Sequence, residues 1–387
     1  MKSVFRKTRI APILLLLSVL YLFHSCDPIN TDKPPVLVDS LGTSISSVEF
    51  ASYKDACLVI VRTNESWTAT ASANWISLSA NSGKGNTAFL IGSNENQEFK
   101  REGKVTINTG KKSKEIKIVQ DGTSRMVLNI LGINIALRKI EGGVFTMSGS
   151  DNISYYGVAH QVTLSDFYIM ETEVTNQLWK TVMKTLPYDT IPEFTGHSQH
   201  LKPFQAVSAT NWNDVNGKFL TAFNQITAKT FKLPTEAQWE YAACGGKYYQ
   251  GKKYAGSDKL DDVAWYYSNS GGEKHDVGDK NPNELGLYDM SGNVSEWCSD
   301  WYDQNFGFPI QNNTLIVPAN QNDPIGPSTG TKKVVRGGSY VSELMFSTDC
   351  NVKDRRSIKP NGYDMYEGNP RVFFMCKNTG FRLVVTQ

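Results

Sequence analysis

Residues 286–302, GLYDMSGNVSEWCSDWY, place two carboxylates on either side of a tight turn. Asp289 and Glu296 flank the Gly292–Asn293 pair, and glycine with asparagine is typical of a turn. Carboxylates and loop carbonyls that converge from such a turn offer oxygen ligands alone, which is the donor set that calcium prefers. The alternative is a turn held by hydrogen bonds of the Asn293 side chain, with Glu296 acting only as a cap.

Further motifs surround this stretch in a defined order along residues 125–387. They are GGVFTM (142–147), HQVTLSDFYIMETEVTN (160–176), FKLPTEAQWEYAACGG (231–246), NPNELGLYDMSGNVSEWCSDWY (281–302), VVRGGSY (334–340) and GFRLV (380–384). In this order they resemble the formylglycine-generating enzyme, or sulfatase-modifying factor, family. The resemblance implies a loop-rich fold related to C-type lectins and stabilised by bound calcium. It also implies the calcium ligands, namely the side chains of Asp289 and Glu296 and the backbone carbonyls of Gly292 and Val294.

The segment RGGSYVSELMFSTDC, residues 336–350, resembles the active-site loop of that family. In catalytic members a cysteine lies two residues after the aromatic residue and another lies five residues later, and the pair holds Cu(I) and oxidises a substrate cysteine with oxygen. Counted from Tyr340, these positions are Ser342 and Ser347 here. Thiolates select Cu(I), whereas a serine hydroxyl is a hard and weak donor. We therefore expect no bound copper and no family catalysis.

Four cysteines lie in this second domain: Cys244, Cys298, Cys350 and Cys376. Four cysteines allow three pairings in an oxidising compartment. The resemblance favours a Cys298–Cys350 disulfide, because cysteines recur together at these positions in lipoprotein-like members of the family. The sequence leaves the pairing of Cys244 and Cys376 open.

Residues 39–122 contain short alternating apolar and polar runs at the spacing typical of a β-sandwich. The runs around Trp67 and Trp75 and the closing IVQDG (118–122) resemble the BACON domain of Bacteroidetes proteins, which implies an immunoglobulin-like sandwich. We expect both tryptophans to pack in the core or at its rim rather than to bind sugar. The predicted fold class is α+β, with an immunoglobulin-like β-sandwich followed by a C-type-lectin-like domain.

Three helices are expected in the second domain. Thr175 is the predicted N-cap of the first, and residues 211–227 form the second. In the third, Thr235 and Gln238 have the spacing of a capping box, and the Gly-Gly pair that follows ends the helix.

Residues 1–25 have the form of an export signal, with basic residues followed by the apolar run IAPILLLLSVLYLF. The run is too short for a convincing membrane-spanning helix. Cys26 resembles the lipidated first residue of a bacterial lipoprotein, and residues 26–38 are predicted to be a flexible linker. We expect an exported protein anchored by lipid to the outer membrane, on its periplasmic or surface face. The alternative is an ordinary signal peptide with an incidental cysteine.

The overall charge gives no reason to expect a nucleic-acid partner. The chain has 40 Lys and Arg residues against 38 Asp and Glu residues, without long runs of either sign. Nor does any serine lie in a recognisable nucleophile motif with histidine and acidic partners. The balanced charge disfavours a nucleic-acid-binding protein, and the lack of a nucleophile motif disfavours a serine hydrolase. Ligand binding is then the simplest remaining function.

The segment PNGYDMYEGNPRVFF, residues 360–374, has the polar and aromatic composition typical of recognition loops. Its candidate binding residues are Asn361, Tyr363, Asp364 and Tyr366. The leading hypothesis is a non-catalytic envelope lipoprotein that binds a glycan or a surface protein. The alternatives are a family oxidoreductase that acts through different residues, a diversified ligand-binding protein, and a loop with no special role.

Overall fold

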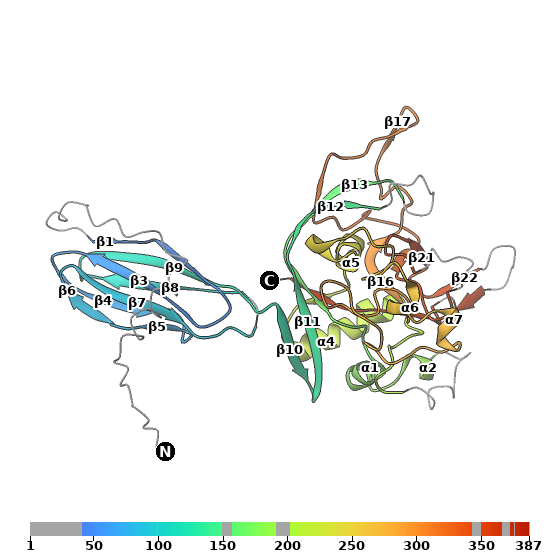
Figure 1. Cartoon of the computed structure of the whole chain (residues 1–387), viewed down its shortest axis with the longest axis horizontal. Coiled ribbons are helices and arrows are strands. Elements are labelled where there is room, and N and C mark those ends of the chain that lie inside the picture. The colour runs from blue at the N-terminus through green and yellow to red at the C-terminus, as the bar shows by residue number, and fades with distance from the viewer. Residues whose placement is uncertain are drawn as a thin grey trace, which may run out of the picture. The chain divides into compact units, whose positions relative to one another are not determined.

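The chain divides into two compact units, Met1–Thr123 and Ser124–Gln387, in a computed structural model (Figure 1). The predicted signal peptide, Cys26 and the linker lie outside the described residues. Within the described part of the chain, no helix is both long enough and apolar enough to cross a bilayer. The structure describes residues 41–98, 100–148, 157–190, 202–342, 350–365, 372–374 and 376–386.

The first unit consists of two β-sheets that share one hydrophobic core. One sheet has the order β1 (Gly42–Thr43), β3 (Asp55–Arg62), β7 (Thr87–Ser93), β5 (Ile76–Leu78). The other has the order β2 (Ser47–Phe50), β9 (Ser113–Gln120), β8 (Arg101–Asn108), β4 (Ser66–Ala71), β6 (Ser82–Lys84). Alternate residues of the long strands are buried, so each sheet turns one face inward. The unit is therefore a β-sandwich, and its relation to immunoglobulin domains stays a prediction.

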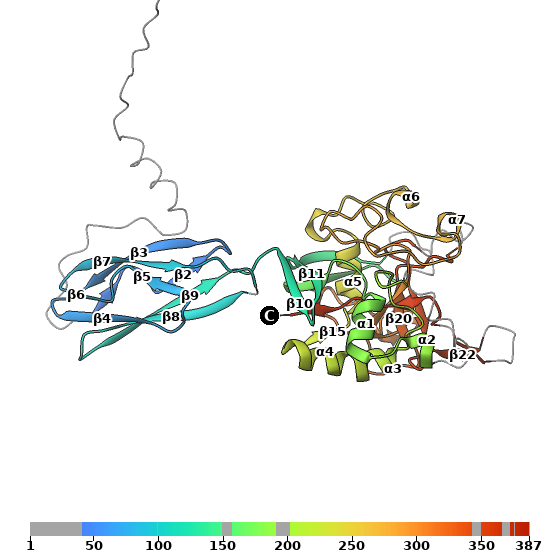
Figure 2. The same ribbon diagram turned by 90° about the horizontal axis from the view of Figure 1, so that it is seen from below.

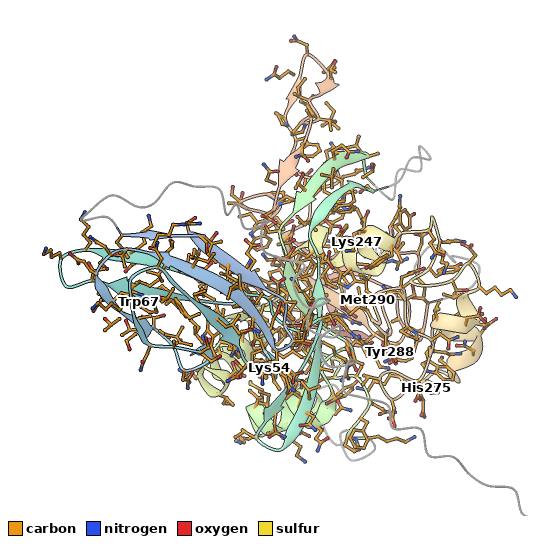
Figure 3. All side chains as sticks on the ribbon, turned by 60° about the vertical axis from the view of Figure 1, so that its left-hand side comes forward. Lys54, Trp67, Lys247, His275, Tyr288 and Met290 are labelled. Carbon is orange, nitrogen blue, oxygen red and sulfur yellow. The ribbon has the colours of Figure 1, made fainter. Side chains whose placement is uncertain are left out.

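Trp67 is a core residue of this sandwich, as predicted. Its side chain lies among the strands of the first unit (Figure 3), with its ring centroid 5.4 Å from that of Phe89. The indole N–H donates to Thr87 Oγ1 at 3.0 Å, which satisfies its one polar atom. Trp75 is half-buried, and the Arg101 guanidinium lies 4.6 Å from its ring centroid. Neither ring is an open platform for stacking a sugar.

The second unit is organised around a five-stranded sheet and several smaller ones. The large sheet has the order β10 (Arg125–Ile130), β11 (Ile133–Ile140), β14 (Phe167–Met170), β25 (Val384–Val385), β15 (Phe231–Lys232). A second sheet has the order β21 (Arg356–Ile358), β20 (Lys333–Arg336), β16 (Ser295–Trp301), β24 (Thr379–Gly380). A third joins β12 (Gly143–Met147), β13 (His160–Leu164) and β19 (Gln321–Asn322). Two hairpins complete the set, β17 (Ile310–Gln311) with β18 (Thr314–Leu315) and β22 (Tyr363–Met365) with β23 (Val372–Phe374).

Short helices cover this framework. Figure 2 shows α1, α3 and α4 on one side of the second unit and α6 and α7 on the other. Two predicted N-caps are confirmed, because Thr175 accepts from Leu178 N and the Thr235–Gln238 capping box is formed. The described helices are α1 (Asn176–Met183), α2 (Pro187–Thr190), α3 (Trp212–Asp214), the π-helical η3 (Val215–Phe219), α4 (Leu220–Thr227), α5 (Glu236–Ala243), the 3-10 turn η4 (Gly246–Tyr248), α6 (Leu260–Val263) and α7 (Tyr267–Ser270).

The turn at residues 289–293 leads into β16. The short strand β24 pairs with β16 in parallel. Asn293 is the residue that holds this turn, since its Oδ1 accepts from His275 N at 3.0 Å and its backbone N–H donates to Trp265 O at 2.8 Å. Gly292 has a φ of +80° and donates to Gly337 O at 2.8 Å. The hydrogen-bonded turn considered from the sequence is therefore present.

Substitution of Gly380 tests how tightly β24 packs against this region. A Cβ at Gly380 would lie 2.2 Å from Val207 O and 2.9 Å from Val294 Cγ2, so Gly380→Ala forces the backbone apart. We expect a loss of about 2 kcal/mol in the free energy of unfolding, measured by urea denaturation. The matched control is Gly217→Ala, where no atom lies within 4 Å and the helix gains about 0.5–1 kcal/mol. Equal stability of the two variants would contradict the packing.

Candidate functional site

Glu296 and Arg382 form a fully buried ion pair at the centre of the second unit. The Arg382 Nε donates to the two carboxylate oxygens at 2.9 and 2.8 Å, and Nη2 donates to Oε1 at 2.7 Å. Trp239 Nε1 donates to Oε2 at 2.9 Å. Both oxygens of Glu296 thus accept hydrogen bonds from N–H groups. The Arg382 guanidinium is the donor that carries a positive charge.

The predicted role of Glu296 as a calcium ligand does not fit this geometry. A cation at its oxygens would have to displace the Arg382 guanidinium, which would then lie buried beside a second positive charge. The resemblance did not reveal this, because GFRLV and the GLYDM stretch are more than 80 residues apart and only the fold brings Arg382 to Glu296.

Asp289, the other predicted carboxylate ligand, lies in a different environment. Its Oδ2 accepts from Gly278 N at 2.7 Å, while its Oδ1 is buried without a hydrogen-bond partner. Burial is the main cause that raises the pKa of Asp289 to about 6, and burial together with the charge of Asp289 raises the pKa of Glu173 well above its usual range. The orphaned oxygen is compatible with a cation, but no group of three His, Cys, Asp or Glu side chains within the described ranges is arranged to hold a metal. Calcium at Asp289, Gly292 and Val294 stays a prediction.

The Gly337–Gly338 turn holds Ser342 in a structural role. Ser339 N donates to Ser342 Oγ at 2.9 Å, and Ser342 N donates back to Ser339 O at 2.9 Å. Both glycines have positive φ, of 91° and 70°, which L side chains rarely adopt. The Ser342 hydroxyl is thereby an acceptor within the turn. Ser347 lies outside the described residues.

The predicted Cys298–Cys350 disulfide is wrong. Cys298 is a buried free thiol that lies on β16 and packs with Trp239 and other residues of the main core. Cys350 belongs to a separate cluster with Tyr254 and Tyr266. The two cysteines occupy different hydrophobic clusters, so their shared recurrence in relatives does not produce a bond here.

Burial is the common feature of three thiols in this unit. Cys244 and Cys376 are buried free cysteines, and burial raises the pKa of each thiol, as it does for Cys298. A thiolate is the form that binds copper or attacks a substrate. Burial therefore disfavours the reactive thiolate form of these three cysteines.

Lys274 is a buried cation that the sequence did not single out. Its Nζ donates to Ala206 O at 2.7 Å and to Ser208 Oγ at 3.1 Å, and it lies 5.6 Å from the centroid of the Tyr188 ring. Burial lowers the pKa of Lys274 to about 7, against a smaller opposing effect of Glu173. In sequence it lies in the polar run GGEKHD, which resembles an exposed loop, so no local signal marks it.

Tyr363 lines a cavity of about 400 Å³ between α1, the start of α3 and the β22 strand. Asn361, another predicted binding residue, helps to hold the backbone of Tyr363, because its Oδ1 accepts from Tyr363 N at 3.1 Å. The side chain of Asp364 and the whole of Tyr366 lie outside the description. The cavity combines apolar walls with polar groups, the latter being Thr210, Asn211, Asp214 and Lys218.

Family models match both units of the chain. A model described as "Sulfatase-modifying factor enzyme 1-like domain" matches residues 136–387. The BACON model, described as "Putative binding domain, N-terminal", matches residues 65–121. Both resemblances drawn from the motifs are thereby confirmed.

Individual proteins show the same likeness. "Chaperone protein LppX" of Paenibacillus barcinonensis is 37% identical over 204 residues, which cover 42% of this chain and 70% of that protein. The formylglycine-generating enzyme of Streptomyces coelicolor is 29% identical over 299 residues, which cover 62% of this chain and 88% of the enzyme. Among solved structures, Treponema denticola variable protein 1 has a TM-score of 0.54 and 27% identity, covering 68% of this chain and 100% of its own. PvdO from Pseudomonas aeruginosa has a TM-score of 0.50 and 22% identity, with coverage of 68% and 98%, and shares the fold alone.

Replacement of Arg382 tests whether Glu296 depends on it. Arg382→Met leaves a buried carboxylate without its charged partner, and we expect a loss of about 3–5 kcal/mol in the free energy of unfolding. The matched control is Lys218→Met, which removes a largely exposed pair with Asp214 and should change stability by less than about 1 kcal/mol. If calcium restored the stability of the Arg382 variant, Glu296 would return to the set of calcium ligands.

The pH dependence of stability tests the environment of Lys274. Its folded pKa of about 7 lies below the usual value of about 10.4, so the unfolded chain binds one more proton between these pH values. Stability should therefore rise with pH across this window, by up to about 1.4 kcal/mol per pH unit from this group. Lys274→Met should lack that contribution, whereas Lys232→Met, at an exposed position, should retain it. Parallel pH profiles for the wild type and Lys274→Met would show that Lys274 is not buried as described.

Proposed function

This chain belongs to the sulfatase-modifying factor enzyme 1-like family, and we propose that it is a non-catalytic member whose family domain binds a glycan. We further propose that it is an envelope lipoprotein attached through Cys26, with the predicted outer-membrane location. The basic and apolar leader and the position of Cys26 support that attachment.

The observation that carries the proposal is the state of Ser342. A family oxidase needs a soft thiolate at this position to hold copper, and here a hydroxyl accepts a hydrogen bond from Ser339 N within the turn. The buried free thiols of Cys244, Cys298 and Cys376 have raised pKa values and supply no substitute. The described turn of this loop thus carries a hydroxyl where the family resemblance implies a copper-binding thiolate.

The cavity beside Tyr363 supports glycan binding. Sugar recognition combines an aromatic or apolar surface with a few polar groups in a concave site. Tyr363 supplies an aromatic side chain, and Asn211 and the Asp214–Lys218 pair, joined at 2.6 Å, supply donors and acceptors. A volume of about 400 Å³ falls within the range typical of small-ligand sites. A concave site of this kind suits a sugar better than the flat surface of a folded protein.

Three alternatives have specific support. The relative named "Chaperone protein LppX" favours a protein client instead of a glycan. The relatives named formylglycine-generating enzyme favour an oxidoreductase that acts through other residues. The structural likeness to Treponema denticola variable protein 1 favours a diversified ligand-binding protein.

A glycan array probed with the purified full-length protein tests the proposal. We expect retention on a restricted set of glycans and at least about tenfold weaker binding for Tyr363→Ala, because aromatic contacts dominate such sites. Tyr53→Ala removes an exposed tyrosine of the first unit and is the matched control, expected to bind like the wild type. Binding lost equally in both variants would place the ligand elsewhere, and a clean failure on the array with a folded protein would favour the protein client.

Metal analysis separates the binding module from the oxidoreductase. We expect no stoichiometric copper and no oxygen consumption with a cysteine-containing peptide. Bound copper together with oxygen consumption would overturn the non-catalytic assignment.

A further inference from the structure

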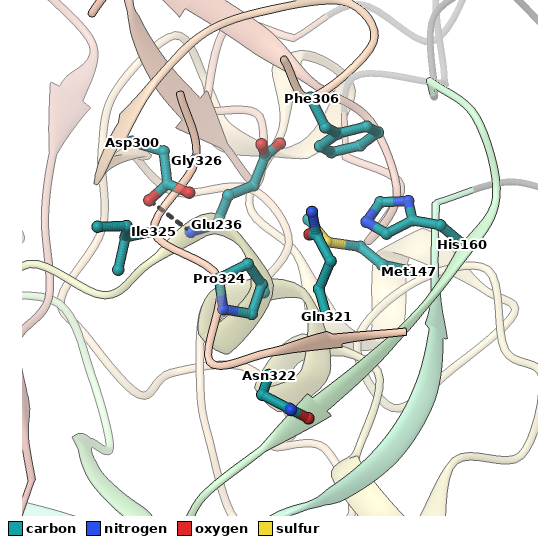
Figure 4. A pocket seen from close by; sticks show the side chains of 11 residues that line it. Met147, His160, Glu236, Asp300, Phe306, Gln321, Asn322, Pro324, Ile325 and Gly326 are labelled. Carbon is teal, nitrogen blue, oxygen red and sulfur yellow. Dashed lines mark hydrogen bonds between the residues drawn. The ribbon is translucent and has the colours of Figure 1, made fainter. Parts of the chain in front are cut away.

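A second cavity, of about 290 Å³, lies between the N-terminus of α5, the β13 strand and the segment that follows β19. Figure 4 shows Asp300 on one side of this space and His160 on the other, with Gln321 between them. Phe306 and Pro324 add apolar walls, and Ile325, which is 74% exposed, marks the opening to solvent. None of these residues belongs to the cavity beside Tyr363.

Asp300 presents one carboxylate oxygen to the cavity without a partner. Its Oδ2 accepts from Glu236 N at 3.0 Å, which caps α5, and from Ser299 Oγ at 2.9 Å (Figure 4 draws the first of these bonds). Within the described ranges no donor forms a hydrogen bond with Oδ1. The residue as a whole is only 4% exposed, and Oδ1 is not among the side-chain atoms fully shielded from solvent, so a group that enters the cavity can reach this oxygen.

Gly326 allows the wall of the cavity to approach Asp300. A Cβ at Gly326 would lie 2.9 Å from Asp300 Oδ1, and the residue has a φ of +72°. Any side chain at this position would therefore press against the Asp300 carboxylate. Glycine leaves the space beside Oδ1 open.

His160 offers a second acceptor across the cavity. Its Nδ1 lies 2.9 Å from Val158 O, and because a carbonyl only accepts, Nδ1 carries the proton and Nε2 is the acceptor in the neutral ring. Burial lowers the pKa of His160, which keeps the ring neutral at pH 7. The rings of Phe306 and Phe308 contact it edge-on, with centroids 4.6 and 4.9 Å away, and fix its orientation.

The neighbouring charges leave Asp300 as the carboxylate available to a ligand. Glu236 is already paired with Arg355, whose Nε and Nη2 donate to its two oxygens at 2.6 and 2.7 Å. Lys333 faces Asp300 from β20, but its Nζ donates to Ser299 O at 2.7 Å and lies 3.8 Å from the centroid of the Trp301 ring. Neither cation fills the cavity.

We propose that this cavity binds a primary ammonium group carried on a compact, ring-sized body. The ammonium would donate to Asp300 Oδ1, while the body packs against Phe306 and Pro324 and extends toward the neutral His160 ring on the other side of the cavity. A buried carboxylate acceptor selects a charged donor over a neutral hydroxyl of the same shape. This proposal does not rest on the glycan site.

The ionisation of Asp300 gives the proposal a pH signature. Burial and the charge of Glu236 raise the pKa of Asp300 to about 7, against smaller effects of the Glu236 N–H, Ser299 and Lys333. An ammonium favours the ionised carboxylate, so affinity should rise about tenfold from pH 6 to pH 8, where the ionised fraction rises from about one tenth to about nine tenths.

Calorimetric titration of the full-length protein with cyclohexylammonium chloride tests the site, with cyclohexanol as the neutral probe of equal shape. We expect saturable binding of the amine at pH 8, the tenfold weakening at pH 6, and no measurable binding of the alcohol. Asp300→Asn should weaken binding at pH 8 at least about tenfold and abolish the pH dependence. The matched control Asp214→Asn removes the same charge in the other cavity and should bind like the wild type, as should Tyr363→Ala. Absence of amine binding by the wild type, or equal binding by Asp300→Asn, would overturn the proposal.

A second variant guards against loss of the α5 cap in Asp300→Asn. Ile325→Arg places a cation at the exposed mouth without touching the cap, and it should also weaken amine binding. Unchanged affinity in this variant would contradict the location. Competition by glucosamine or by Nα-acetyllysine then distinguishes a sugar amine from a peptide amine, and failure of glucosamine to compete would contradict a site that accepts an ammonium group on any ring-sized body.

Discussion

The loops of the second unit depend on the buried ion pair between Glu296 and Arg382. Taking two charges out of water carries a penalty of several kcal/mol per ion, so each charge requires the other. Arg382 also donates to the carbonyls of Met170 and Glu171, both at 3.1 Å, and of Tyr288 at 2.7 Å. One guanidinium thereby joins the C-terminal segment to β14, to β16 and to the GLYDM stretch.

Two similar pairs attach α5 to the rest of the unit. Glu240 pairs with Arg336, the residue before the Gly-Gly turn, and Glu236 pairs with Arg355 beyond it. Many strands here have only two to four residues, so the strand ladders alone do not fix the long loops. Each buried pair requires one arrangement of its two partners, so these pairs fix the positions of the loops. They add little net stability compared with apolar packing.

The sequence predicted what local chemistry determines. The Thr175 and Thr235 caps follow from hydrogen bonds within a few residues, and they are present. The Asn293 turn was considered from its Gly-Asn pair, although its side chain is held by the backbone of His275, 18 residues away. The sequence failed where the partner is distant in the chain. Neither the occupation of Glu296 by a guanidinium nor the separation of Cys298 from Cys350 has a local signal. The acceptor at Asp300 was missed for the same reason, because its cavity is closed by a segment more than 20 residues away.

Backbone hydrogen bonds determine the geometry of the Gly337–Gly338 turn. Backbone bonds from Gly292 N to Gly337 O and from Tyr340 N to Asn293 O, both 2.8 Å, hold the turn without any thiol. The Ser342 hydroxyl then accepts from Ser339 N at 2.9 Å, a length that suits oxygen and that the larger, weakly accepting sulfur of a cysteine does not reproduce. Serine at this position is therefore a better acceptor inside the turn than the cysteine that the family resemblance implies. Hydrogen bonds of the backbone and of this hydroxyl are thus enough to hold the turn without a thiol, which supports the proposed role in ligand binding.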